Sequence, residues 1–137
     1  MKLKLQLVRD GEIIFEMPLS PEDWPRDELV NDLNAFEADF QRFSQIFTAL
    51  SNETRFMMMK QFIEKRSNMI TFSDFMRDLD LNPKLVWENT KKLRAGGFIE
   101  KVGRGKYRCS KFGESGFMMM SLALKRLLGV LEEFENY

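Results

Sequence analysis

The chain has 137 residues, 44% of them hydrophobic and 31% charged, with zero net charge, which predicts one soluble globular domain, with or without an appendage. It has no histidine and a single cysteine, Cys109, so it lacks the commonest general base and metal ligand and has no internal disulfide. No apolar run reaches the roughly 18–20 residues of a membrane span, and the alternating N-terminus does not resemble a signal peptide.

The N-terminal forty residues predict a β-hairpin followed by helix. Residues 2–8 alternate apolar and polar side chains, Asp10-Gly11 is a strong two-residue turn signal, and residues 13–17 return as the second strand. Three prolines then mark a connection. Apolar residues recur at helical spacing from Arg26 to Leu50, with a possible break near Arg42.

The middle of the chain predicts three helices separated by capping signals. Asn52 is a suitable N-cap for a helix reaching about Arg66, and residues 69–71 resemble a short strand. Thr71 or Ser73 can cap the second helix. The third has Asn82 as N-cap, Pro83 at its first position and Gly96-Gly97 at its end.

The C-terminal third predicts a second hairpin and a long helix. Residues 98–102 and 107–109 read as strands joined by a glycine-containing turn, and a helix is expected from about Glu114 to Phe134. The order helix, helix, helix, strand, turn, strand is the winged-helix layout. We therefore predict a mainly α fold with small β-structure, divided into an N-terminal appendage of β-hairpin and acidic helix (1–42), a winged helix-turn-helix (43–112) and a long C-terminal helix (113–137).

Four segments between residues 43 and 116 resemble the ArsR-type winged-helix transcriptional regulators. Residues 49–55, ALSNETR, are similar to the family's Ala-Leu-x-x-x-Thr-Arg motif, and residues 81–93, LNPKLVWENTKKL, resemble its recognition segment. Residues 94–100, RAGGFIE, and 107–113, YRCSKFG, look like the passages into and out of the wing.

The resemblance implies a homodimeric DNA-binding regulator without catalytic activity. Members of the family commonly dimerise through terminal helices, so it also implies a two-fold dimer built from residues 117–134, within the C-terminal dimerisation helix (113–137), and part of residues 26–47. The metal-sensing members use clusters of Cys and His, which this chain lacks, so metal sensing does not carry over. At the outward positions of the recognition helix, which are usually small, polar or basic in the family, this chain has Trp87 and Glu88.

A basic segment coincides with the expected recognition helix and wing. Residues 71–109 carry nine Lys/Arg against five Asp/Glu, whereas residues 1–70 carry nine against twelve. Cations on one helix face and on a flexible glycine turn can neutralise phosphates. The predicted contacts to double-stranded DNA are Lys84, Trp87, Glu88, Lys91, Lys92, Arg104, Lys106 and Arg108. Arg55 is expected to be structural, and Asn89 could reach a base only by rotating off the inward face.

The tetrapeptide Phe-Met-Met-Met occurs at residues 56–59 and 117–120. Four consecutive apolar residues cover every side of a helical turn, so each copy should contact the core and a second neighbour. We expect this second neighbour to be a partner subunit. The alternative is that the methionines line a pocket for a small-molecule effector. The expected dimerisation residues are Phe117, Met120, Leu124, Leu127, Leu128 and Leu131.

The sequence thus predicts a cytoplasmic DNA-binding regulator that acts as a homodimer and uses no metal or other cofactor. The alternative is a winged helix that binds another protein through Trp87 and Glu88 without binding DNA. In that reading Trp87 is an anchor residue of a protein interface.

Overall fold

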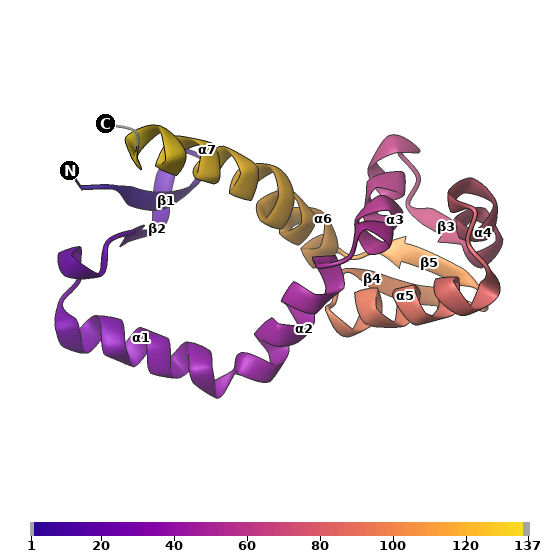
Figure 1. The fold of residues 1–137 in the computed structure, drawn as a ribbon, viewed down its shortest axis with the longest axis horizontal. Coiled ribbons are helices and arrows are strands. Elements are labelled where there is room, and N and C mark those ends of the chain that lie inside the picture. Colours follow the sequence, from indigo (N-terminus) through magenta and orange to yellow (C-terminus); the bar gives the residue numbers. More distant parts are fainter. Residues whose placement is uncertain (1, 136–137) are drawn as a thin grey trace. The chain divides into compact units, whose positions relative to one another are not determined.

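The computed structural model describes residues 2–135 and separates them into two units, with the boundary between Phe40 and Gln41 (Figure 1). Helices predominate and both β-sheets are small and antiparallel, which confirms the predicted mainly α fold. None of the helices within residues 2–135 combines the length and the apolar composition that crossing a bilayer requires.

The first unit contains a hairpin and one helix. Its elements are β1 (Lys4–Arg9), β2 (Glu12–Pro18), a 3₁₀ turn (Pro21–Asp23) and α1 (Arg26–Ala38). Asp10 and Gly11 both have positive φ, 50° and 85°, so the Asp-Gly pair forms the predicted tight turn. The first strand begins two residues later than predicted, and the helical break lies at Asp39 rather than near Arg42.

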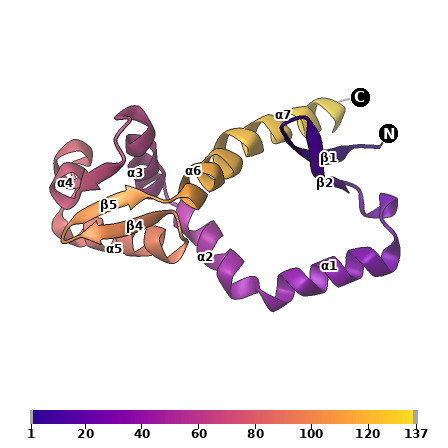
Figure 2. The same cartoon turned by 180° about the vertical axis from the view of Figure 1, so that it is seen from behind.

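The second unit contains the remaining helices and a three-stranded sheet. Its elements are α2 (Phe40–Leu50), α3 (Glu53–Glu64), β3 (Met69–Thr71), α4 (Phe72–Leu79), α5 (Pro83–Ala95), β4 (Ile99–Gly103), β5 (Lys106–Cys109), α6 (Lys111–Met118), a π-helical turn (Met119–Ala123) and α7 (Leu124–Glu135). The strand order is β3-β5-β4, with every pair antiparallel (Figure 2). Asn52, Thr71, Asn82 and Ser110 all cap helices through their side chains.

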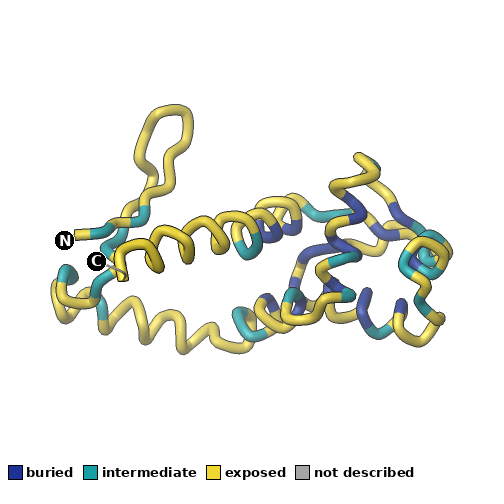
Figure 3. The backbone as a smooth tube through the Cα atoms, turned by 45° about the horizontal axis from the view of Figure 1, so that its top comes forward, coloured by how far each residue is buried: buried dark blue, intermediate teal, exposed yellow. Residues whose placement is uncertain are grey.

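The hydrophobic core lies in the second unit, where Figure 3 shows the buried positions. Its fully buried side chains come from α2, α3, α4, α5, β3 and the residue that precedes β4, so these elements enclose one interior. The largest are Phe75, Phe98, Met58, Met59, Ile70 and Leu93. Met58 and Met59 confirm that the first Phe-Met-Met-Met segment contacts the core, whereas Phe56 in the same segment is 37% exposed.

The C-terminal helix differs from the prediction at two points. It begins at Lys111, because Ser110 caps it, and a π-helical turn at Met119–Ala123 interrupts it. The Ser121 hydroxyl donates to the Phe117 carbonyl, and such a bond competes with the regular backbone ladder. This hydrogen bond spans the start of the interruption.

Phe117 is a core residue rather than a dimerisation residue. Only 6% of its surface is exposed, and its ring centroid lies 5.3 Å from that of Phe56. It shares a helix face with the buried glycines Gly113 and Gly116, and this face points inward. The other predicted dimerisation positions are exposed, except Met120, which is partly buried.

Gly113 permits α6 to approach the backbone at Phe98. A Cβ atom at residue 113 would lie 1.9 Å from the Phe98 carbonyl oxygen, which no side-chain movement can relieve. Gly113→Ala should therefore lower the free energy of unfolding by about 3 kcal/mol, measured by urea denaturation. The matched control is Gly129→Ala in α7, where a Cβ meets nothing within 4 Å. That change should raise stability by up to about 1 kcal/mol; equal effects of the two variants would contradict the predicted clash.

Candidate nucleic-acid interface

Helices α4 and α5 are joined by a three-residue turn with well-defined caps. Thr71 and Asp74 form a reciprocal capping box at the start of α4, and hydrogen bonds from the Thr71 backbone and then its side chain lower the pKa of Asp74. Asp80 closes α4 in the left-handed conformation, with φ of 52°. The Asn82 side chain then accepts from the Leu85 N–H at 2.9 Å, and Pro83 opens α5 as predicted.

The inner face of α5 is fixed by burial and by one arginine. Val86 and Leu93 are completely buried, and Asn89 and Thr90 lie beside them. The Asn89 Oδ1 atom accepts from Arg55 Nη1 at 2.8 Å, while its Nδ2 atom donates to the Leu85 carbonyl at 2.8 Å. Both ends of the Asn89 amide are thus engaged inside the protein, so Asn89 is not available to read a base.

Arg55 connects α3 with α2 and α5. Besides Asn89, its guanidinium donates to the Ala49 carbonyl through Nε at 2.8 Å and to the Thr48 carbonyl through Nη2 at 2.9 Å. These carbonyls belong to the last turn of α2, where the helix dipole favours a cation. Burial lowers the pKa of Arg55 from its usual value. The structure agrees with the structural role expected for Arg55.

The outer face of α5 is exposed and carries four of the predicted contact residues. The Lys84 side chain is 81% exposed, and its ammonium lies 4.0 Å from a carboxylate oxygen of Glu88. Trp87 is 57% exposed, and the Lys91 ammonium lies 5.0 Å from the centroid of its ring. The cation–π contact and the ion pair arrange two lysines, an indole and a carboxylate on one surface.

Lys92 and Arg94 extend this surface in two directions. Lys92 lies towards α2, where it lines a shallow depression with Ser44, Gln45, Thr48 and Ala95. Arg94 is exposed and follows Trp87 by seven positions, so it shares the side of α5 on which Trp87 and Lys91 lie. Arg94 was not among the predicted contacts, although it belongs to the segment 94–100 that resembles the passage into the wing. The helical spacing alone identifies it.

The turn between β4 and β5 is short and is held by α4. Gly105 has φ of 64°, and its carbonyl accepts from the Phe72 N–H at 2.8 Å. Arg104 and Lys106 at this turn are exposed. The turn was expected to be flexible, but this hydrogen bond anchors its backbone to the first residue of α4.

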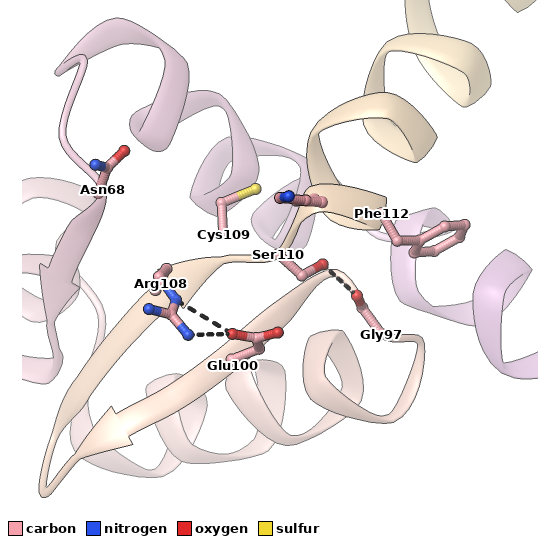
Figure 4. A pocket seen from close by; sticks show the side chains of 8 residues that line it. Asn68, Gly97, Glu100, Arg108, Cys109, Ser110 and Phe112 are labelled. Carbon is pink, nitrogen blue, oxygen red and sulfur yellow. Dashed lines mark hydrogen bonds and ion pairs between the residues drawn. The ribbon is translucent and has the colours of Figure 1, made fainter.

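Arg108 is exposed but already paired. Its Nε and Nη2 atoms donate to Glu100 Oε2 at 3.1 and 2.7 Å, across neighbouring strands (Figure 4). Because alternate residues of a strand point to opposite faces, Arg108 points away from the core that contains Tyr107. Arg108 therefore lies on the outer face of the sheet, which the core and α5 do not cover.

An open depression of about 710 Å³ adjoins Arg108. Figure 4 shows it between the ends of β4 and β5 and the start of α6, with Arg108, Glu100 and Cys109 in its lining. Its lining residues include none of the methionines that were considered for an effector pocket. Burial, then the charges of Glu114 and Glu100, raise the pKa of the Cys109 thiol to about 11.

The described part of the chain, residues 2–135, contains no group of three or more His, Cys, Asp or Glu side chains that could hold a metal ion. No protein-family model matches the sequence. No curated protein matches it either.

Arg55→Met should destabilise the protein by about 3 kcal/mol, because it leaves the Asn89 oxygen and the buried Ala49 carbonyl without the donor that Arg55 supplies and removes one bond to the Thr48 carbonyl. Thermal and urea unfolding measure the loss. Arg94→Met is the matched control and should change stability by less than about 0.5 kcal/mol, since Arg94 is exposed. A similar small change for Arg55→Met would show that its bonds do not stabilise the domain.

Cys109 should alkylate slowly at neutral pH because its pKa is raised to about 11. At pH 8 the folded protein should react with iodoacetamide about 100-fold more slowly than a thiol of pKa 9, the ordinary value. The rate should rise about tenfold per pH unit up to about pH 11. Protein unfolded in urea serves as the control. A plateau in the folded protein near pH 9 would contradict the raised pKa.

Proposed function

We propose that residues 43–112 form a winged helix-turn-helix that binds double-stranded DNA, and that the protein is a homodimeric, non-enzymatic transcriptional regulator. The order α3, β3, α4, α5, β4, β5 supports this proposal. So do the short turn from Asp80 to Asn82 and the hairpin that follows α5. The resemblance of residues 43–116 to ArsR-type regulators points to the same function. A cytoplasmic location of the protein is part of the same proposal.

The observation that carries the proposal is the division of α5 into an anchored and a free face. A recognition helix must hold its position while presenting cations and hydrogen-bonding groups to the major groove. In α5, Val86, Asn89 and Leu93 are buried, whereas Lys84 and Lys91 are exposed on the opposite side. This arrangement meets both requirements.

The chemistry of each outer residue of α5 suggests which group of the DNA it contacts. Lys84, Lys91 and Arg94 supply positive charge for phosphates. Trp87 offers an apolar surface to a thymine methyl group, and Glu88 can accept a hydrogen bond from a cytosine amine. Arg104 and Lys106 at the β4–β5 turn add cations for a neighbouring stretch of the DNA backbone. Because Arg108 is paired with Glu100, we propose that it contributes less to DNA binding than the other cations do.

The exposed apolar side chains of α7 support the proposed homodimer. Leu124, Leu127, Leu128 and Leu131 are all 36–48% exposed, and α7 has no buried residue. A two-fold axis would place the two α5 helices on half-sites about one turn of DNA apart, roughly 34 Å.

The exposed indole also favours a second function, binding of another protein. Trp87 is 57% exposed, and tryptophan is enriched among the residues that dominate protein interfaces. The two functions differ in their response to salt, because DNA binding releases counterions and a largely apolar protein interface does not.

Binding to a non-specific DNA duplex should weaken steeply with salt, when measured by fluorescence anisotropy at several potassium chloride concentrations. Lys91→Glu should weaken binding at every concentration and reduce the slope of log K against log salt by about 1 to 2. Lys60→Glu is the matched control, since Lys60 is exposed on α3 and pairs with Glu64. Failure of the unaltered protein to bind at low salt would exclude DNA binding and favour the protein-binding alternative.

A further inference from the structure

The depression beside Arg108 is built from separate parts of the second unit (Figure 4). Asn68 precedes β3, Glu100 and Arg108 lie on the neighbouring strands β4 and β5, and Lys111 is the first residue of α6. Its volume of about 710 Å³ lies within the roughly 300–1,000 Å³ of sites that bind small organic molecules. No residue of α5 lines it, so it is a different site from the outer face of that helix.

The ion pair in this depression leaves hydrogen-bonding groups on both partners unused. Both bonds from Arg108 go to the same oxygen of Glu100, Oε2, at 3.1 and 2.7 Å. Within residues 2–135, neither Oε1 of Glu100 nor Nη1 of Arg108 has a hydrogen-bond partner. A guanidinium held along one edge by a carboxylate keeps its orientation and can donate its remaining N–H groups to a second acceptor. The pair therefore presents a donor and an acceptor side by side.

Lys111 adds a second cation to the lining. Its side chain is exposed, and no residue of the described range 2–135 forms an ion pair or hydrogen bond with its ammonium. The side-chain amide of Asn68 is likewise unbonded in that range. The Cys109 thiol is neutral at pH 7, because its pKa is raised to about 11. The charged groups of the lining are thus two cations, Arg108 and Lys111, and one anion, Glu100.

These charges define the class of ligand that fits the depression. Glu100 would repel a phosphate or a simple carboxylate, and a neutral apolar molecule would cover three charges without pairing any of them. A ligand with two carboxylates and one ammonium matches the lining charge for charge, and an acidic amino acid has these groups. Its ammonium and α-carboxylate are attached to one carbon atom. Their protein partners must therefore be neighbours, as Glu100 and Arg108 are at 2.7 Å.

We propose that this depression is a binding site for a free acidic amino acid. Arg108 pairs with the α-carboxylate, and Glu100 accepts a hydrogen bond from the ammonium through Oε1. Lys111, on a different element, pairs with the side-chain carboxylate. This site goes beyond the proposed function and does not depend on DNA binding.

Titration of the isotope-labelled protein with L-glutamate or L-aspartate at low salt, followed through its backbone amide signals by NMR, tests the site. We expect saturable shifts at Asn68, Ser110 and Lys111, with a Kd of about 1 mM or tighter, since the charged groups are exposed to solvent. Glutarate lacks the ammonium and L-glutamine lacks the side-chain carboxylate, so each should bind about fivefold more weakly than glutamate. The absence of saturable shifts up to roughly 20 mM amino acid, or equal binding of glutarate and glutamate, would overturn the proposal.

Two substitutions assign the groups of the ligand to their partners. Glu100→Gln should remove the preference for glutamate over glutarate, and Lys111→Met the preference for glutamate over glutamine. A general disturbance of the structure would weaken all ligands alike and would not remove one preference alone. Lys101→Met is the matched control, since Lys101 is exposed on β4 outside the lining, and it should keep both preferences. Preferences that survive in Glu100→Gln and Lys111→Met would overturn the assignment.

These measurements use no DNA, so they separate this site from the proposed function. Glutamate binding by a protein that does not bind DNA would refute only the proposed function. DNA binding by a protein that does not bind either acidic amino acid would refute only this inference.

Discussion

The hydrogen bonds of one buried arginine hold the second unit in its arrangement. Arg55 starts on the first turn of α3, reaches the last carbonyls of α2 and meets the Asn89 amide on α5. A buried cation is tolerated only where acceptors surround it, and here a helix end and a side-chain amide supply them. Helices α2 and α3, which are consecutive, and the more distant α5 are thereby fixed at one point, and the orientation of α5 depends on that point.

The consequence appears on the other side of α5. Since the inner residues are held by packing and by Arg55, the outer residues have a fixed direction, and Lys91 lies over the ring of Trp87. The β4–β5 turn is fixed separately, through the bond from Phe72 to Gly105. Both cationic elements are thus positioned by the domain before any ligand arrives, which reduces the ordering cost of binding an anion.

Apolar segments with similar spacing are buried in one part of the chain and exposed in another. In the second unit Met58, Met59 and Phe117 complete an enclosed core. In the first unit and in α7 equally apolar sequences remain at the surface, although their spacing is as regular. Burial of these stripes needs a neighbour that periodicity cannot identify, since a helix with an apolar face is the same sequence whether it packs within a chain or between chains.

The sequence by itself determined the local structure: Asn52, Thr71, Asn82 and Ser110 cap helices because their side chains accept from backbone N–H groups a few residues away. It also determined which face of α5 is apolar. Only the tertiary structure decided that Asn89 accepts a hydrogen bond from Arg55, that Glu100 forms an ion pair with Arg108 and that Phe117 is buried. These contacts join residues 8 to 61 positions apart, and such distances are set by packing and strand register, which local pattern does not encode.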